Sequence, residues 1–213
     1  MGISRRKLLQ GAAAAAGVSA AGAPGLLLAQ NQPIKIGLIY TLSGPYAIAG
    51  VPHMRAAQLA IDHYNQDGGL LGRKLESVVR DDKFTGAGAV AAARELSGQG
   101  INLFVGGGSS VAALGVIPLL AEMKAVMTMS GTAAMAVTHE SFSRNAFRVL
   151  ANANMQYGGL GSAMAKQFPN VMKWQSIAPD SSFGRDAAKT FSANLRMAHP
   201  KACLLYTSDA ADE

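Results

Sequence analysis

The stretch IKIGLIYTLSGPY, residues 34–46, decides the fold class of this sequence. Residues 34–40 are apolar apart from Lys35, and several of them are β-branched. The turn-forming residues Ser43, Gly44 and Pro45 follow closely. Because a short apolar run bounded by turn formers is typical of a buried strand, the stretch predicts such a strand, followed by a loop.

Helix-like and strand-like patterns alternate along the rest of the chain. Further strands are expected at residues 74–80, 101–105, 125–129, 145–150 and 171–177, and helices at residues 51–65, 86–99, 110–123, 155–168 and 183–197. The first helix is expected to carry an apolar face made of Ala56, Leu59, Ala60, His63 and Tyr64. Single helices between strands predict right-handed βαβ units, a parallel sheet and helices on both of its faces. The predicted fold class is therefore α/β, with a doubly wound parallel sheet.

The pattern divides the chain into two α/β lobes. Residues 30–150 are expected to form the first lobe, which ends with the crossing strand at residues 145–150. Residues 151–202 are expected to begin a second lobe, and the strands in them do not complete its sheet. We therefore predict two lobes, the second of them truncated.

Residues 1–29 have the pattern of a signal peptide. Arg5, Arg6 and Lys7 precede an uncharged stretch rich in alanine and glycine, and the small residue Ala29 marks the expected cleavage site. The arginine pair after Ser4 is similar to a twin-arginine signal, and an ordinary Sec signal is the alternative. Both alternatives predict export to the periplasm.

Residues 203–213 differ in character from the sequence before them. They have no apolar periodicity, and they back-translate to a transposon adaptor that is used to prepare sequencing libraries. We therefore expect them to be an adaptor artefact, the alternative being a genuine, irregular end.

Charge and composition argue against several classes of function. The chain has 19 Lys and Arg residues against 13 Asp and Glu residues, but its positive charges are spread singly, so a nucleic-acid partner is not expected. Cys203, inside the expected artefact, is the only cysteine, and the four histidines lie far apart. The sequence therefore indicates no disulfide, metal site or cofactor.

Three loops that follow predicted strands are candidates for a ligand site. They are residues 41–46, 106–110 and 130–134, and each offers hydroxyls, small side chains or backbone N–H groups before a helix. Ligands bind at the carboxyl ends of such strands, and N–H groups there can accept an anion. Ser109 and Ser110 could hold a carboxylate, but Ser109 could equally be a helix cap.

The sequence does not predict an enzyme. It contains no Gly-x-Ser-x-Gly elbow and no phosphate-binding loop with Gly-Lys-Ser or Gly-Lys-Thr. Asp81 and Asp82 are adjacent carboxylates, but neighbouring residues of a strand point to opposite faces. A role in capping a loop is the better interpretation of this pair.

Motifs through the chain resemble those of type I periplasmic binding proteins for branched-chain amino acids and related amides. The most specific are IKIG at residues 34–37, LSGP at residues 42–45, AAQLAI at residues 56–61 and RDD at residues 80–82. The similarity extends from Ile34 to about Arg196. It implies an N-terminal fragment of a type I periplasmic-binding-protein fold, in which a hinge joins two doubly wound lobes.

The resemblance also implies a function without chemical turnover. Members of the family bind a small molecule, such as an amino acid or amide, and deliver it to an inner-membrane ABC permease. This implies a monomer when full length. The same fold also serves sensor domains of receptors and regulators, which is the alternative function. By position, the ligand-binding residues would be Tyr46, Ser109, Ser110, Ser130, Thr132, Ala133 and Phe183.

Overall fold

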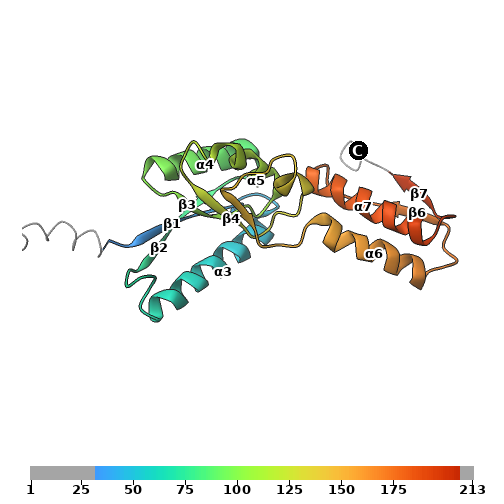
Figure 1. Cartoon of the computed structure of the whole chain (residues 1–213), viewed down its shortest axis with the longest axis horizontal. Coiled ribbons are helices and arrows are strands. Elements are labelled where there is room, and N and C mark those ends of the chain that lie inside the picture. Colours follow the sequence, from blue (N-terminus) through green and yellow to red (C-terminus); the bar gives the residue numbers. More distant parts are fainter. Residues whose placement is uncertain (1–31, 207–213) are drawn as a thin grey trace, which may run out of the picture. The chain divides into compact units, whose positions relative to one another are not determined.

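The sheet expected from the strand pattern is present in the computed structural model, which describes residues 32–206 (Figure 1). Within these residues, five strands follow the order β2-β1-β3-β4-β5. They are β1 Ile34–Tyr40, β2 Leu75–Asp81, β3 Leu103–Gly106, β4 Val126–Met129 and β5 Ala146–Arg148. Strand β3 pairs in parallel with β1 and β4, and β4 pairs in parallel with β5. The predicted parallel α/β sheet is confirmed.

Helices lie on both sides of this sheet. They are α3 Ala47–Gln66, α4 Gly86–Gly98 and α5 Ser110–Val116. The alanine-rich faces of α4 and α5 pack with Phe104, Met127 and Met129 in one buried core. Figure 1 shows α3 on the other side of the strands from α4. Small alanines let the helix backbones approach the sheet closely, and the larger strand side chains fill the space between them.

The first helix differs from the prediction in its start and in its buried face. It begins at Ala47 rather than at residue 51, because the turn at Gly44 leads directly into it: Ala47 N–H donates to Gly44 O at 3.1 Å. The expected apolar face is largely exposed, with 56% of Leu59 and 57% of Tyr64 accessible to solvent. Periodicity identifies an apolar face, but only the tertiary packing determines whether a face is buried.

The helix expected at residues 110–123 is shorter than predicted. Regular α5 ends at Val116, and a 3₁₀ turn, Ile117–Leu119, follows. Pro118 lies in that turn and has no backbone N–H to donate to an earlier carbonyl. The proline therefore explains why the α-helix stops there.

The second sheet has its own helices. It pairs β6 Lys173–Ser176 in parallel with β7 Cys203–Tyr206. Helices α6 Ala153–Gln167 and α7 Ser182–Ala198 pack with it around buried Ala165, Leu195 and Ala202. Residues 203–206 form β7, although no regular element was predicted there. The adaptor origin of residues 203–213 stays a prediction, because strand pairing does not test it.

The described chain divides into two compact units, which do not follow the expected lobe boundary. The smaller combines residues 32–34 with Ile61–Glu76, and in it Asn65 binds both backbone groups of Leu75, at 2.7 and 2.9 Å. The larger combines Lys35–Ala60 with residues 77–206. The boundary between residues 150 and 151 stays a prediction. The expected signal peptide lies outside the described residues.

None of the helices in residues 32–206 combines the length and the apolar character needed to cross a membrane.

Candidate ligand-binding site

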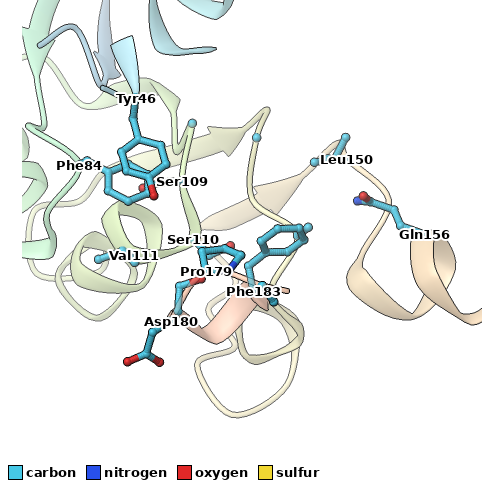
Figure 2. Close-up of a pocket in the computed structure, with 15 residues that line it drawn as sticks. Tyr46, Phe84, Ser109, Ser110, Val111, Leu150, Gln156, Pro179, Asp180 and Phe183 are labelled. Carbon is cyan, nitrogen blue, oxygen red and sulfur yellow. The ribbon is translucent and has the colours of Figure 1, made fainter. Parts of the chain in front are cut away.

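A cavity of about 520 Å³ lies in the larger unit (Figure 2). Its wall comes from the loops after β1, β2, β3 and β4, and from residues around the starts of α6 and α7. Five of the seven predicted ligand-binding residues line it, namely Tyr46, Ser109, Ser110, Ala133 and Phe183. The structure therefore brings together residues from three loops and from the starts of two helices, α5 and α7, that are far apart in the sequence.

The two adjacent serines have structural hydrogen bonds. Ser109 Oγ accepts the Ala112 N–H at 3.1 Å and so caps α5. Ser110 Oγ accepts the Ala134 N–H at 3.2 Å, which ties the loop after β3 to the loop after β4. The helix cap predicted as one alternative for Ser109 is confirmed. Ligand binding by these serines stays a prediction.

Ser130 and Thr132 lie outside the cavity lining that the described chain forms. Thr132 is fully buried, and its Oγ1 donates to Gly107 O at 2.6 Å. Ser130 Oγ lies 3.0 Å from the phenolic oxygen of Tyr40. These contacts join the loop after β4 to neighbouring parts of the sheet edge. That Ser130 and Thr132 contact a ligand stays a prediction.

The glycines after β3 serve the packing of the backbone. A Cβ at Gly106 would lie 2.1 Å from Ile39 O, which is an impossible contact. Gly107 has φ +60°, a left-handed conformation that glycine adopts without strain. Both glycines are therefore needed for the close approach and tight turn that bring Ser109 to the cavity.

Phe84 also forms part of the cavity wall and was not predicted from the sequence. Its ring stacks on that of Tyr46, with 3.5 Å between the centroids and 5° between the planes. Figure 2 shows the two rings overlapping beside Ser109. An aromatic residue in the loop after a strand of the predicted sheet was the available signal, because ligand loops follow such strands. Leu150, Gln156, Pro179 and Asp180 also line the cavity and were not predicted.

Asp81 and Asp82 join the loops that carry the two stacked rings. Asp81 Oδ1 accepts the N–H groups of Leu42 and Lys83, each at 2.9 Å. Asp82 Oδ1 accepts the Thr41 hydroxyl at 2.6 Å and the Phe84 N–H at 2.8 Å. The predicted loop-capping role of this pair is confirmed.

The two carboxyl groups differ in their electrostatics. Burial raises the pKa of Asp82 above its ordinary value, and its hydrogen bonds to Thr41 and Phe84 oppose that shift only in part. Partial burial also acts to raise the pKa of Asp81, but hydrogen bonds from Leu42, Ser43 and Lys83 outweigh it, so this pKa lies below its ordinary value. Asp81 is therefore the better stabilised anion.

Phe183 enters the cavity from the start of α7. Ser181 Oγ accepts the Gly184 N–H at 3.2 Å and caps this helix. The ring of Phe183 lies 5.9 Å from that of Tyr157 at 59°. Asp186, one turn further along, accepts the Met135 N–H at 2.7 Å and links α7 to the 3₁₀ turn after β4. The helix cap and this link hold Phe183 in place.

The cavity can bind a small organic molecule. Its wall combines aromatic rings, aliphatic side chains, the hydroxyls of three serines and one tyrosine, and exposed backbone, which is the usual make-up of a small-molecule site. Its carboxylate, Asp180, forms an ion pair with Arg185. Among residues 32–206, no group of three or more His, Cys, Asp or Glu side chains could hold a metal ion.

Comparison with known proteins gives consistent matches. The family model described as "Periplasmic binding protein" matches residues 33–211. Leu/Ile/Val-binding protein BraC3 of Rhizobium johnstonii is 32% identical over 166 residues, which make up 78% of this chain and 44% of that protein. This chain spans about half the length, or less, of the curated relatives that it matches.

Solved structures agree in fold. A periplasmic binding protein from Burkholderia mallei superposes with a TM-score of 0.70 and 26% identity, covering 84% of this chain and 48% of that one. An ABC-transporter solute-binding protein from R. palustris, in complex with 4-hydroxybenzoate, superposes with a TM-score of 0.69 and 26% identity, covering 86% and 49%. Similar folds therefore bind chemically different ligands.

Proposed function

Because this chain belongs to the type I periplasmic binding proteins of the branched-chain amino acid family, we propose that it is part of the solute-binding component of an ABC importer. Membership confirms the resemblance predicted from the motifs of the first 82 residues. In this proposal the protein works in the periplasm, captures a small molecule and delivers it to an inner-membrane permease, without chemical turnover.

One observation carries the proposal: loops from the carboxyl ends of four neighbouring strands converge on one cavity, and α7 adds Phe183 to it. Ligands of open parallel sheets bind at this edge. A contact of Ser109 and Ser110 with a ligand carboxylate would be compatible with their observed bonds, since a hydroxyl that accepts a backbone N–H can still donate its own hydrogen. We therefore propose a ligand with a carboxylate or amide head group, such as a branched-chain amino acid.

The remaining parts of the proposal rest on the sequence. A signal peptide at residues 1–29 would direct export to the periplasm. Residues 30–150 and 151–202 would belong to two lobes, which close around the ligand and present the closed form to the permease. A ligand favours the closed form only as far as it binds that form more tightly than the open one.

A thermal-shift measurement tests the proposed function. The protein expressed from its complete gene is heated with leucine, isoleucine, valine, small amides or aromatic acids. Stabilisation by a ligand at 100 times its dissociation constant amounts to about 2.7 kcal/mol, so at least one compound should raise the melting temperature by several degrees. No shift with any compound would contradict the proposal.

Two variants on α6 show whether the cavity is the site. Gln156 lines the cavity and Gln167 does not, although both side chains are exposed on the same helix. Gln156→Trp should fill the cavity and abolish the ligand-induced shift, whereas Gln167→Trp should keep it. Loss of the shift in both variants would mean that tryptophan disturbs the helix itself.

A further inference from the structure

We propose that the stacked pair of Tyr46 and Phe84, here called the aromatic wall, makes the site select a ligand with a planar ring. The two rings lie 3.5 Å apart and nearly parallel, and both line the cavity (Figure 2). This inference rests on the proposed function, because it concerns the ligand of the same site. It adds a specificity-determining residue, Phe84, and a ligand class: planar rings that carry a carboxylate.

Local contacts within the protein hold the aromatic wall in place. Lys83 and Phe84 both have left-handed backbone conformations, with φ of +53° and +58°. Such conformations are costly for residues other than glycine and persist only where the surroundings impose them. The hydrogen bonds from Lys83 N–H to Asp81 and from Phe84 N–H to Asp82 supply this restraint. A wall already in place costs less entropy on binding than one that must order itself.

A third ring reaches the same cavity from α7. Phe183 also lines it and holds an inclined contact with Tyr157. The cavity volume of about 520 Å³ is ample for a single six-membered ring with a carboxylate. Tyr46 remains 46% exposed despite its stacking, so part of its ring surface is open to a ligand.

Aromatic walls distinguish planar rings from aliphatic groups of similar size. Both kinds of group gain from burial, which depends on apolar area. Only an aromatic ring also gains from offset-stacked or edge-to-face contact, and that contact is worth a further factor of about 2 to 10 in affinity. Comparing ligands with the same head group and ring size but different planarity isolates this factor.

Isothermal titration calorimetry on the protein expressed from its complete gene tests the inference with two matched pairs. One is phenylalanine with 3-cyclohexylalanine, and the other is 4-hydroxybenzoate with trans-4-hydroxycyclohexanecarboxylate. The planar member of at least one pair should bind about 2 to 10 times more tightly. The pair that binds distinguishes an amino-acid head group from a simple carboxylate.

The variant Phe84→Leu should lower that ratio, because it removes one ring of the aromatic wall and leaves an apolar side chain of similar character. Tyr46→Leu should act in the same direction. Phe142→Leu is the matched control: Phe142 is 71% exposed and lies outside the cavity lining of the described chain, so the ratio should not change. A thermal melt of each variant verifies folding.

Other results would overturn the inference. If the saturated members bind as tightly as the planar ones, or if Phe84→Leu weakens both members of a pair alike, the aromatic wall is only a structural contact between two loops. If leucine, isoleucine or valine binds and neither planar compound does, the inference fails while the proposed function stands. If no compound binds, the proposed function fails as well.

Discussion

Asp82 is fully buried, and its Oδ2 has no hydrogen-bond partner among residues 32–206. Its Oδ1 accepts both the Thr41 hydroxyl and the Phe84 N–H. Asp82→Ala should therefore lower the free energy of unfolding by about 1–3 kcal/mol for each buried donor left without a partner. Asp82→Asn keeps an acceptor at Oδ1 and should cost less. Urea titration measures both, and equal losses would contradict this account.

The raised pKa of Asp82 also predicts that the free energy of unfolding depends on pH. Burial raises the pKa of Asp82 in the folded protein. At pH values between the ordinary pKa and the raised one, the folded protein therefore holds a proton on Asp82 that the unfolded chain has released. The stability due to Asp82 is therefore fully present below the ordinary pKa, about 3.9, and falls as pH rises through the raised pKa.

The test is the difference in free energy of unfolding between the wild type and Asp82→Asn. This difference should shift in favour of the wild type as pH falls from about 7 towards about 4. Asp81, whose pKa shifts in the opposite direction, is common to both proteins, so the subtraction removes most of its effect. A difference that does not vary with pH would mean that the raised pKa is absent.

Replacement by alanine should have opposite effects on stability at two helical glycines. A Cβ at Gly50 would lie 1.8 Å from Thr41 O, so Gly50→Ala should separate α3 from the loop after β1 and cost more than about 3 kcal/mol. At Gly98, the last residue of α4, no described atom beyond its chain neighbours and the adjacent backbone of its own helix lies within 4 Å of an added Cβ. Gly98→Ala should therefore stabilise the protein by about 0.5–1 kcal/mol. Chemical denaturation compares the two, and similar effects would contradict the packing of α3.

At the scale of the element, α3 shows that an apolar stripe need not be a buried one. Ile61 is 9% exposed, whereas Leu59, two positions earlier, is 56% exposed. Ile61→Ala should lower the free energy of unfolding by about 2–5 kcal/mol, and Leu59→Ala should change it by less than about 0.5 kcal/mol. Urea denaturation of both variants is the test. A comparable loss at both positions would show that the Leu59 face is covered in the protein.

The positions of the strands were easier to predict from the sequence than the ends of the helices. Each predicted strand from residue 34 to residue 150 overlaps an observed one, because apolar runs between turn formers leave few alternatives. Helix ends moved where a local feature was overlooked, as with the turn at Gly44 before α3 and Pro118 after α5. Strand β7 was missed because residues 203–206 were set aside as an artefact.

At the scale of the whole molecule, one face of the five-stranded sheet is incompletely covered. Leu103 and Val126 are partners in adjacent strands and so share a face, on which they are 47% and 37% exposed. Phe147 pairs with Thr128 on that same face and is 53% exposed. The opposite face buries Phe104, Met127 and Met129. Such contiguous apolar exposure is typical of a surface that another segment or molecule covers.

This exposure predicts the behaviour of residues 30–206 expressed alone. They should self-associate and bind a hydrophobic dye, because unprotected apolar faces of sheets and helices attract one another. Size-exclusion chromatography and dye fluorescence are the measurements. Phe147→Lys should reduce the association, and Lys173→Glu, an exchange of one exposed charge for another, is the control. A monomer with one cooperative thermal transition would contradict the prediction.

The sequence by itself determined the class of the fold and the region of the site. Strand periodicity, turn residues and the order of elements are local properties, so they predict a parallel α/β sheet and loops at its carboxyl edge before any contact is known. The same local reasoning identified the loop-capping role of Asp81 and Asp82. Five of the seven predicted ligand residues lie in one cavity for this reason.

Only the tertiary structure decided what each of those residues touches. Thr132 is turned into the protein by its bond to Gly107, and the ring of Phe84 meets that of Tyr46 because two loops are joined through Asp82. It also decided that Leu59 is exposed while Ile61 is buried. These outcomes depend on contacts between residues that are distant in sequence. Close packing depends on the shapes of all neighbouring side chains together, so a local sequence pattern does not predict it.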